Sequence, residues 1–259
     1  MATRSHAFLL VLACALCGAA LGDPRTAVAG QSCASGEAVS GSVLADNFVP
    51  SMDDLNTNVS ANNGFGTSAV GTAGPNTVFG LGQCLRDLSP LDCKLCFAEV
   101  RSLLPKCYPR VGGRLFLDGC FGRYANYSFF GEPLGPADAA VCGSGANYTG
   151  ANPRGFADAV RAAVANVTGE AARGDGFAVG SAEAGGATAF ALAQCWESLN
   201  TSACGQCLRA AAGAAAGCAP ATEGRALYTG CYLRYSTQLF WNVNATAGSG
   251  PSGTTAIPT

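Results

Sequence analysis

Hydrophobic positions at helical spacing fall in two separate stretches of the chain. The stripes consist of Phe48, Met52, Leu55 and Val59 in the first stretch, and of Phe156, Val160, Val164 and Val167 in the second. Each series places its apolar side chains on one face of a helix. A proline stands near each stripe, Pro50 in the first and Pro153 in the second, and proline is favoured in the first turn of a helix. We therefore predict one amphipathic helix in each half of the chain, with the proline at its start.

A second helix and several strands follow in each half. The further helices are predicted from Cys93 to Leu104 and from Cys204 to about Ala216, the latter from its alanine-rich composition. Strands are predicted over 114–124, over 225–235, and in the stretches that end at Cys84 and Cys195. The simplest architecture is α+β, with two tandem domains that each pack two helices on an antiparallel β-sheet.

The cysteines show that the two halves are copies of one domain. The first set is Cys33, Cys84, Cys93, Cys96, Cys107 and Cys120, and the second is Cys142, Cys195, Cys204, Cys207, Cys218 and Cys231. From the second cysteine of each set onward, both copies have the spacing C-x8-C-x2-C-x10-C-x12-C, at a constant offset of 111 residues. The same offset relates Gln83 to Gln194 and Arg114 to Arg225. This agreement indicates a tandem duplication.

The duplication sets the predicted domain boundaries. Residues 30–130 form the first cysteine-rich domain and residues 140–245 form the second. Prolines and glycines in 131–139 predict a linker between them. The tail, 246–259, is rich in glycine, serine and threonine, and we expect it to be flexible.

Residues 1–29 are predicted to be a secretory signal peptide. Arg4 and His6 precede a short apolar run, and small residues follow it. Cleavage after Gly22 or after Ala29 would suit the peptidase, and the sequence favours neither. The run is shorter than the roughly 20 apolar residues of a membrane-spanning helix, and no later segment is long enough. We therefore expect a secreted, extracellular protein with no membrane span in the mature chain.

Composition supports export. Of the 14 cysteines, Cys14 and Cys17 would leave with the leader, and the remaining 12 predict three disulfides per domain in an oxidising compartment. The net charge is −2, and the two lysines, Lys94 and Lys106, make no basic stripe, which argues against nucleic-acid partners. Six glycosylation sequons fit an exported glycoprotein: Asn58, Asn126, Asn147, Asn166, Asn200 and Asn244.

The residue types argue against catalysis. Histidine is absent after His6, which excludes a Ser-His-Asp triad, a Cys-His dyad and a histidine metal site from the mature chain. The two Cys-x-x-Cys pairs suit structural disulfides better than a redox or zinc site in an oxidising compartment. An acidic cluster in the first copy has no acidic counterpart in the second, and we expect its side chains to be solvated. The cluster consists of Asp87, Asp92, Glu99 and Asp118. We predict a protein that is not an enzyme and uses no cofactor or metal.

The cysteine spacing and the following Gly-Cys-aromatic-x-Arg-Tyr strand resemble the plant ginkbilobin-type cysteine-rich domain, also called the stress-antifungal domain. Tandem copies of this domain occur in cysteine-rich repeat secretory proteins, in plasmodesmata-located proteins and in ectodomains of cysteine-rich receptor-like kinases. The segment 230–236 looks most like the receptor-kinase branch, so the chain is either a secreted relative of those receptors or a truncated receptor kinase. The resemblance implies a disulfide pairing that the sequence alone does not select. It joins Cys33 to Cys107, Cys84 to Cys93, Cys96 to Cys120, Cys142 to Cys218, Cys195 to Cys204 and Cys207 to Cys231.

The resemblance also implies a sugar site. Lectins of this type hold mannose with an Asn after the first cysteine, an Arg seven residues after the fifth, and a Glu five residues after the sixth. Arg114 and Arg225 keep the Arg position and are weak candidates for carbohydrate binding. Ala34 and Gly143 stand at the Asn positions, and Ala125 and Ser236 at the Glu positions. Because both acceptors are missing, we favour a structural role for the two arginines, paired with a local carboxylate or carbonyl.

These observations predict a secreted, non-enzymatic binding module in plant extracellular stress or defence signalling. Its partner would be an extracellular protein, a receptor ectodomain or a cell-wall glycan. The alternatives are an antifungal mannose-binding lectin that acts on cell-wall glycans, and a structural or adhesive partner whose copies self-associate.

Overall fold

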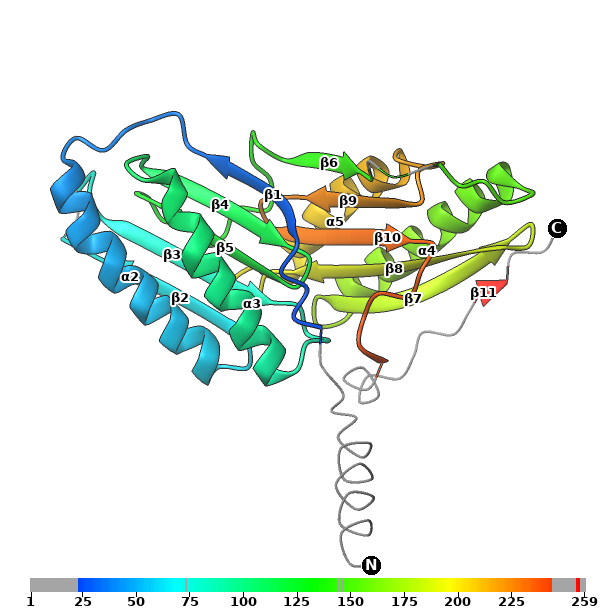
Figure 1. Cartoon of the computed structure of the whole chain (residues 1–259), viewed down its shortest axis with the longest axis horizontal. Coiled ribbons are helices and arrows are strands. Elements are labelled where there is room, and N and C mark those ends of the chain that lie inside the picture. The colour runs from blue at the N-terminus through cyan, green and yellow to red at the C-terminus, as the bar shows by residue number, and fades with distance from the viewer. Residues whose placement is uncertain (1–22, 73, 144, 146, 244–254, 257–259) are drawn as a thin grey trace, which may run out of the picture.

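A computed structural model describes residues 23–72, 74–143, 145, 147–243 and 255–256. Its first half carries the helices α2 (Gly41–Ala61) and α3 (Pro90–Leu103) on one face of a sheet, as Figure 1 shows. The strands are β1 (Val28–Cys33), β2 (Phe65–Val70), β3 (Val78–Cys84), β4 (Gly112–Leu117) and β5 (Cys120–Ala125), and a 3-10 turn, η1, spans Leu104–Cys107. The sheet order is β1-β4-β5-β3-β2, antiparallel throughout.

The second half repeats this arrangement. Its helices are α4 (Pro153–Arg173) and α5 (Thr201–Ala216). Its strands are β6 (Ala139–Cys142), β7 (Phe177–Ala184), β8 (Ala187–Cys195), β9 (Glu223–Leu227) and β10 (Cys231–Ser236). Their order β7-β8-β10-β9-β6 matches the first sheet, and β11 (Thr255–Ala256) lies parallel beside β7. The predicted α+β fold with tandem domains is confirmed.

The helices begin where local chemistry allows, with one difference from the sequence prediction. Helix α4 starts at Pro153, with the Asn152 side chain accepting a hydrogen bond from the Gly155 N–H at 2.8 Å. Helix α2 instead starts at Gly41, so Pro50 lies in its interior and the expectation that it opens the helix is wrong. Leu44 is fully buried and extends the apolar stripe one turn earlier. Burial of this longer stripe offsets the hydrogen bond that an interior proline removes.

Each copy has three disulfides that fasten its second helix, and the turn after that helix, to the sheet. The bonds are Cys33–Cys107, Cys84–Cys93, Cys96–Cys120, Cys142–Cys218, Cys195–Cys204 and Cys207–Cys231. These are the pairs that the family resemblance implies. The bonds Cys33–Cys107 and Cys142–Cys218 span 74 and 76 residues, and they tie the edge strands β1 and β6 to the end of the second helix of their copy. Long loops of this kind restrict the unfolded chain most strongly.

The two cores fill the same space with different side chains. Gly122 on β5 lies so close to α3 that an added Cβ would be 2.3 Å from Val100 Cγ1. At the equivalent positions of the second copy, the strand carries Leu233 and the helix carries Ala211, and both are fully buried. The large side chain has therefore moved from the helix to the strand. Within the described residues, no helix is both long and apolar enough to cross a membrane.

This exchange predicts a compensating pair of substitutions. Gly122→Ala alone should destabilise the protein by about 1–3 kcal/mol, because the core has no room for the methyl group. Val100→Ala should destabilise it through a cavity, and the double variant should lose clearly less than the sum of the two losses. Urea unfolding measures all three free energies. Gly131→Ala is the control, since a Cβ there meets nothing within 4 Å; additive losses would contradict the exchange.

Candidate functional site

The sheet faces not covered by helices meet in one apolar interface between the copies. Its buried members are Leu81, Leu85, Phe116, Phe121, Ala125, Phe129, Leu192, Trp196, Leu227 and Tyr232. The Trp196 ring stacks on the Phe121 ring, with centroids 4.4 Å apart and planes within 3°. The Trp196 Nε1–H also donates to the Thr229 carbonyl at 2.9 Å. This apolar contact, which includes an aromatic stack, makes the two copies one rigid unit.

The contacts across this interface are reciprocal. The Gln194 side-chain oxygen accepts a hydrogen bond from the Arg86 backbone N–H at 2.9 Å, and the Gln83 oxygen accepts one from the Glu197 N–H at 2.8 Å. Gln83 and Gln194 occupy equivalent positions, and so do Arg86 and Glu197, 111 residues apart. The copies are therefore related by an approximate twofold axis, like the subunits of a symmetric dimer.

Both candidate sugar-binding arginines lie buried at this interface. Arg225 donates to both oxygens of Asp118 in the other copy, at 2.6 and 2.7 Å. Arg114 donates to Asp138 at 3.0 Å, to Thr229 at 3.1 Å and to Ser32 at 3.1 Å. Thr229 is the counterpart of Asp118. These contacts support a structural role for both arginines. The carboxylate that pairs with Arg225, however, lies 107 residues away in the sequence, whereas a local partner was expected.

The structure does gather the family's sugar-site positions in the first copy. Ala34, Arg114 and Ala125 line one cavity of about 340 Å³, together with linker residues 132–137. The Arg114 Nη2 donates to the Ala137 carbonyl of this linker, so each nitrogen of its guanidinium already bonds to a protein group. In the second copy the Arg225 Nη1 lies 3.1 Å from Glu223. Neither arginine is left with an unengaged nitrogen for a sugar hydroxyl.

Asp118 is the electrostatic centre of the interface. Besides Arg225, it accepts a hydrogen bond from the Tyr232 hydroxyl at 3.0 Å and lies 3.3 Å from the Arg234 guanidinium. Burial by itself raises the pKa of Asp118, but the hydrogen bonds and positive charges of Arg225 and Arg234 outweigh it and hold the pKa below its ordinary value. The same balance lowers the pKa of Glu223, which bonds to both arginines. The network is therefore charged at neutral pH.

The acidic cluster of the first copy is mostly buried, which corrects the expectation that it is solvated. Asp87, Asp92 and Asp118 are each less than 9% exposed, and only Glu99 is partly exposed among the four. Asp87 pairs with Arg25 at 2.6 Å. Asp92 accepts a hydrogen bond from the Ser89 hydroxyl at 2.6 Å and so closes the start of α3. Each buried carboxylate has a partner, as burial of a charge requires.

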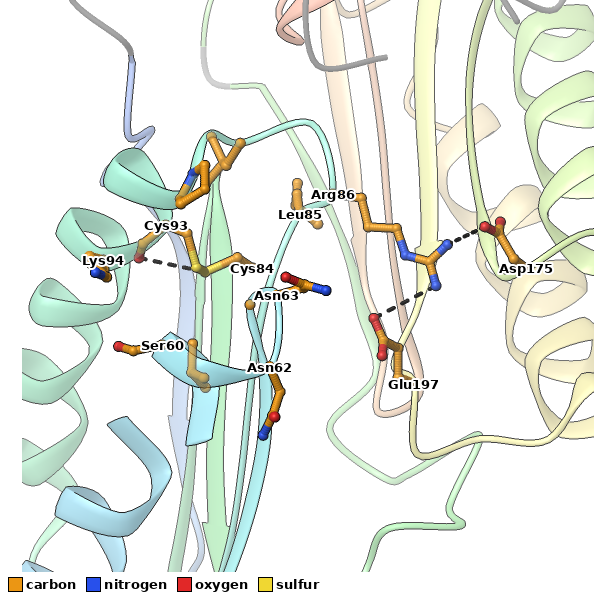
Figure 2. A pocket seen from close by; sticks show the side chains of 14 residues that line it. Ser60, Asn62, Asn63, Cys84, Leu85, Arg86, Cys93, Lys94, Asp175 and Glu197 are labelled. Carbon is orange, nitrogen blue, oxygen red and sulfur yellow. Dashed lines mark hydrogen bonds and ion pairs between the residues drawn. A yellow bond between two sulfur atoms is a disulfide. The ribbon is translucent and has the colours of Figure 1, made fainter. Parts of the chain in front are cut away.

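A two-lobed cleft opens between the copies, close to the approximate twofold axis. The first lobe, of about 580 Å³, is lined mainly by the first copy, and the second, of about 260 Å³, mainly by the second. Arg86, Asp175 and Glu197 line both lobes. Figure 2 shows the Arg86 side chain extended toward the second copy, where it lies 2.5 Å from Asp175 and 3.6 Å from Glu197.

The two lobes differ in chemistry although their positions are equivalent. The first presents the amides of Asn62 and Asn63 and the ammonium group of Lys94, beside aliphatic surface from Leu88. Asp175 occupies the position of Asn63 in the second copy, directly before the equivalent left-handed glycine. Exposed amide, ammonium and carboxylate groups beside apolar surface can recognise a polar ligand, such as a glycan or a peptide segment. Sequence reasoning missed this cleft because its residues come from both copies and form no motif.

Comparison with known proteins assigns the family. The profile described as salt stress response/antifungal matches residues 32–127 and 141–238, one match for each copy. The chain belongs to this family. The predicted tandem organisation of stress-antifungal domains is thereby confirmed.

Relatives of this chain include a receptor-like kinase and a secretory protein. Cysteine-rich receptor-like protein kinase 2 of Arabidopsis thaliana is 50% identical over 200 residues, which cover 76% of this chain and 30% of that protein. Cysteine-rich repeat secretory protein 55 of the same organism is 29% identical over 180 residues, or 68% of each chain. The chain thus spans about a third of the length of the kinase.

A solved stress-antifungal ectodomain has the same fold. The tandem DUF26 ectodomain of the Arabidopsis thaliana cysteine-rich receptor-like protein PDLP8 superposes with a TM-score of 0.66 at 25% identity. The alignment covers 82% of this chain and 98% of that structure. The likeness spans both domains, so the arrangement of two copies in one unit is shared.

The sequons differ in how accessible their amides are. Asn147, Asn166 and Asn200 are exposed, and Asn200 caps α5 through its oxygen, which leaves the amide nitrogen outside that bond. Asn58 is half-buried and its amide nitrogen donates to the Thr67 carbonyl at 2.8 Å. Asn126 is half-buried with a longer bond to a backbone carbonyl, and Asn244 lies outside the described residues.

The Asp118 network predicts a pH-dependent stability. Asp118→Asn should lower the free energy of unfolding by roughly 3 kcal/mol at pH 7, because Arg225 loses its buried counter-charge. The folded-state pKa of Asp118 lies below that of an unfolded aspartate, so its contribution is present above about pH 4 and is lost as the pH falls through the folded-state value. Urea unfolding at pH 7 and pH 2 measures the difference between wild type and variant, which should shrink at pH 2. The exposed Asp158→Asn is the control; an equal difference at both pH values would contradict the assignment.

Proposed function

We propose that this protein is an extracellular, non-enzymatic binding module in plant stress or defence signalling, and that it receives its ligand in the two-lobed cleft. The observation that carries the proposal is that the cleft is built by both copies and is held open by their rigid interface. Family membership supports the biological setting. The relatives include proteins named as receptor-like kinases and as a secretory protein.

The residues available for chemistry favour binding over catalysis. The described part of the chain contains no histidine, and all 12 of its cysteines are in disulfides. Its most buried carboxylates, Asp87, Asp92 and Asp118, are held in ion pairs or a helix cap. These three carboxylates therefore lack the freedom that a general acid or base needs.

The cleft has the properties of a recognition site. Its rigid walls reduce the entropy that binding would otherwise cost. Arg86, with a side chain 30% exposed, bridges the copies and can donate to a ligand once it turns from Asp175. Lys94 lies exposed on α3 at the edge of the first lobe. A polar extracellular ligand, either a glycan or a segment of a receptor ectodomain, would satisfy these donors and the carboxylates facing them.

Ligand screening with cleft variants tests this proposal. The purified, oxidised protein is applied to arrays of plant and fungal cell-wall glycans and of candidate receptor ectodomains, and hits are measured by calorimetry. Arg86→Ala and Lys94→Ala should each weaken binding of a hit by about tenfold, the effect of one lost charged hydrogen bond. The control is Arg161→Ala, an exposed arginine on α4 remote from the cleft residues. A hit that binds both cleft variants as tightly as wild type would contradict the placement of the site.

A further inference from the structure

Arg25 is buried although it lies within residues 1–29, the range predicted to be the leader. It is 7% exposed, and its guanidinium forms an ion pair with the fully buried Asp87 at 2.6 Å. Its backbone has φ of 48°, the left-handed region that costs energy for a residue other than glycine. The Arg25 N–H donates to the Asp23 carboxylate at 2.9 Å, which helps to hold this conformation. Residues 23–25 are therefore packed against the first domain and held there by specific contacts.

The ion pair also forms hydrogen bonds with the backbone of residues 240–242, near the C-terminal end of the second copy. The second oxygen of Asp87 accepts a hydrogen bond from the Asn242 N–H at 2.9 Å, and the Arg25 guanidinium donates to the Phe240 carbonyl at 3.4 Å. Without Arg25, Asp87 would keep one backbone donor and no counter-charge. A buried carboxylate without a counter-charge is strongly unfavourable.

The second copy provides an internal comparison for this segment. Pro24 lies 109 residues before Pro133, the same offset that relates Cys33 to Cys142. An added Cβ on Gly119 would lie 2.5 Å from the Pro24 carbonyl oxygen, and one on the equivalent Gly230 would lie 2.8 Å from Pro133. In both copies, a short segment that contains this proline packs against a glycine between two strands, β4 and β5 in the first copy and β9 and β10 in the second. In the second copy this segment is the linker, which is always present.

The ion pair itself has changed as a unit between the copies. Arg25 corresponds to Leu134 and Asp87 corresponds to Ser198, so both charges are absent from the second copy. Loss of both partners together is expected if each charge is tolerated only beside the other.

We propose that the leader is removed after Gly22, so that the mature chain begins at Asp23 and keeps Arg25 as the counter-charge of Asp87. Cleavage after Ala29, the alternative that the sequence leaves open, would cut inside β1 and remove the residue that pairs with Leu117. It would also remove the segment that the second copy retains. This inference is independent of the proposed ligand site.

The N-terminus of the secreted protein tests the processing site. The full chain, with its own leader, is expressed in plant cells and recovered from the medium, and its N-terminal peptide is sequenced by mass spectrometry. The expected first residue is Asp23. A first residue of Gly30, or a leader that remains attached, would overturn the proposal.

Paired substitutions test the role of Arg25 separately. Arg25→Leu should lower the midpoint of thermal unfolding by roughly 10 °C, because Asp87 is left without its counter-charge. The double variant Arg25→Leu with Asp87→Ser, which copies the second domain, should recover most of this loss. Arg161→Ala serves as the control for removal of an exposed arginine ion pair. Arg25 does not have this role if the double variant has no higher unfolding midpoint than Arg25→Leu. The same conclusion follows if Arg25→Leu lowers the midpoint no more than the control variant does.

Discussion

The fold of this protein depends on the contact between its two copies. Each domain covers only one face of its sheet with helices, and the other face carries large apolar side chains such as Phe121 and Tyr232. Burial of these faces against one another removes the apolar surface from water. The buried pair of Arg225 and Asp118 then fixes the register, since an ion pair tolerates displacement far less than an apolar surface does. The cleft exists because this contact holds Arg86 opposite Asp175 and Glu197.

Duplication supplied the symmetry of the contact, and divergence has made its two sides different. Gln83 and Gln194 still make equivalent hydrogen bonds across the axis. Asp118, in contrast, is replaced by Thr229 in the second copy. Arg225 therefore pairs with Asp118 of the other copy, whereas its counterpart Arg114 pairs with Asp138 of the linker. The same divergence gives only the first lobe of the cleft amides and a lysine, while the carboxylates of Asp175 and Glu197 line both lobes. An asymmetric cleft of this kind would favour one orientation of the ligand that we propose for it, which a symmetric cleft would not do.

Sequence predicted the features that depend on local or periodic signals. The cysteine spacing established the duplication, and the buried residues Phe48, Met52, Leu55 and Val59 follow the helical period. Pro50 misled the prediction because its usual position in the first turn is a preference, and the apolar stripe beginning at Leu44 outweighed it. Strands β2 and β7 were missed, as they consist mostly of small and polar residues that give a weak alternation signal. The partners of Asp118 and Asp87 lie 107 and 62 residues away, and no spacing rule relates them.

A double-mutant cycle on Asp118 and Arg225 tests most directly whether a coupled interface makes the copies one unit. Unfolding free energies are measured for wild type, Asp118→Ala, Arg225→Ala and the double variant. The structure predicts that the two losses are not additive, with a coupling energy of roughly 2 kcal/mol, because the two buried side chains form a bidentate ion pair with each other. Losses that add to within about 0.5 kcal/mol would contradict a coupled interface, and with it the rigid cleft on which the proposed function rests.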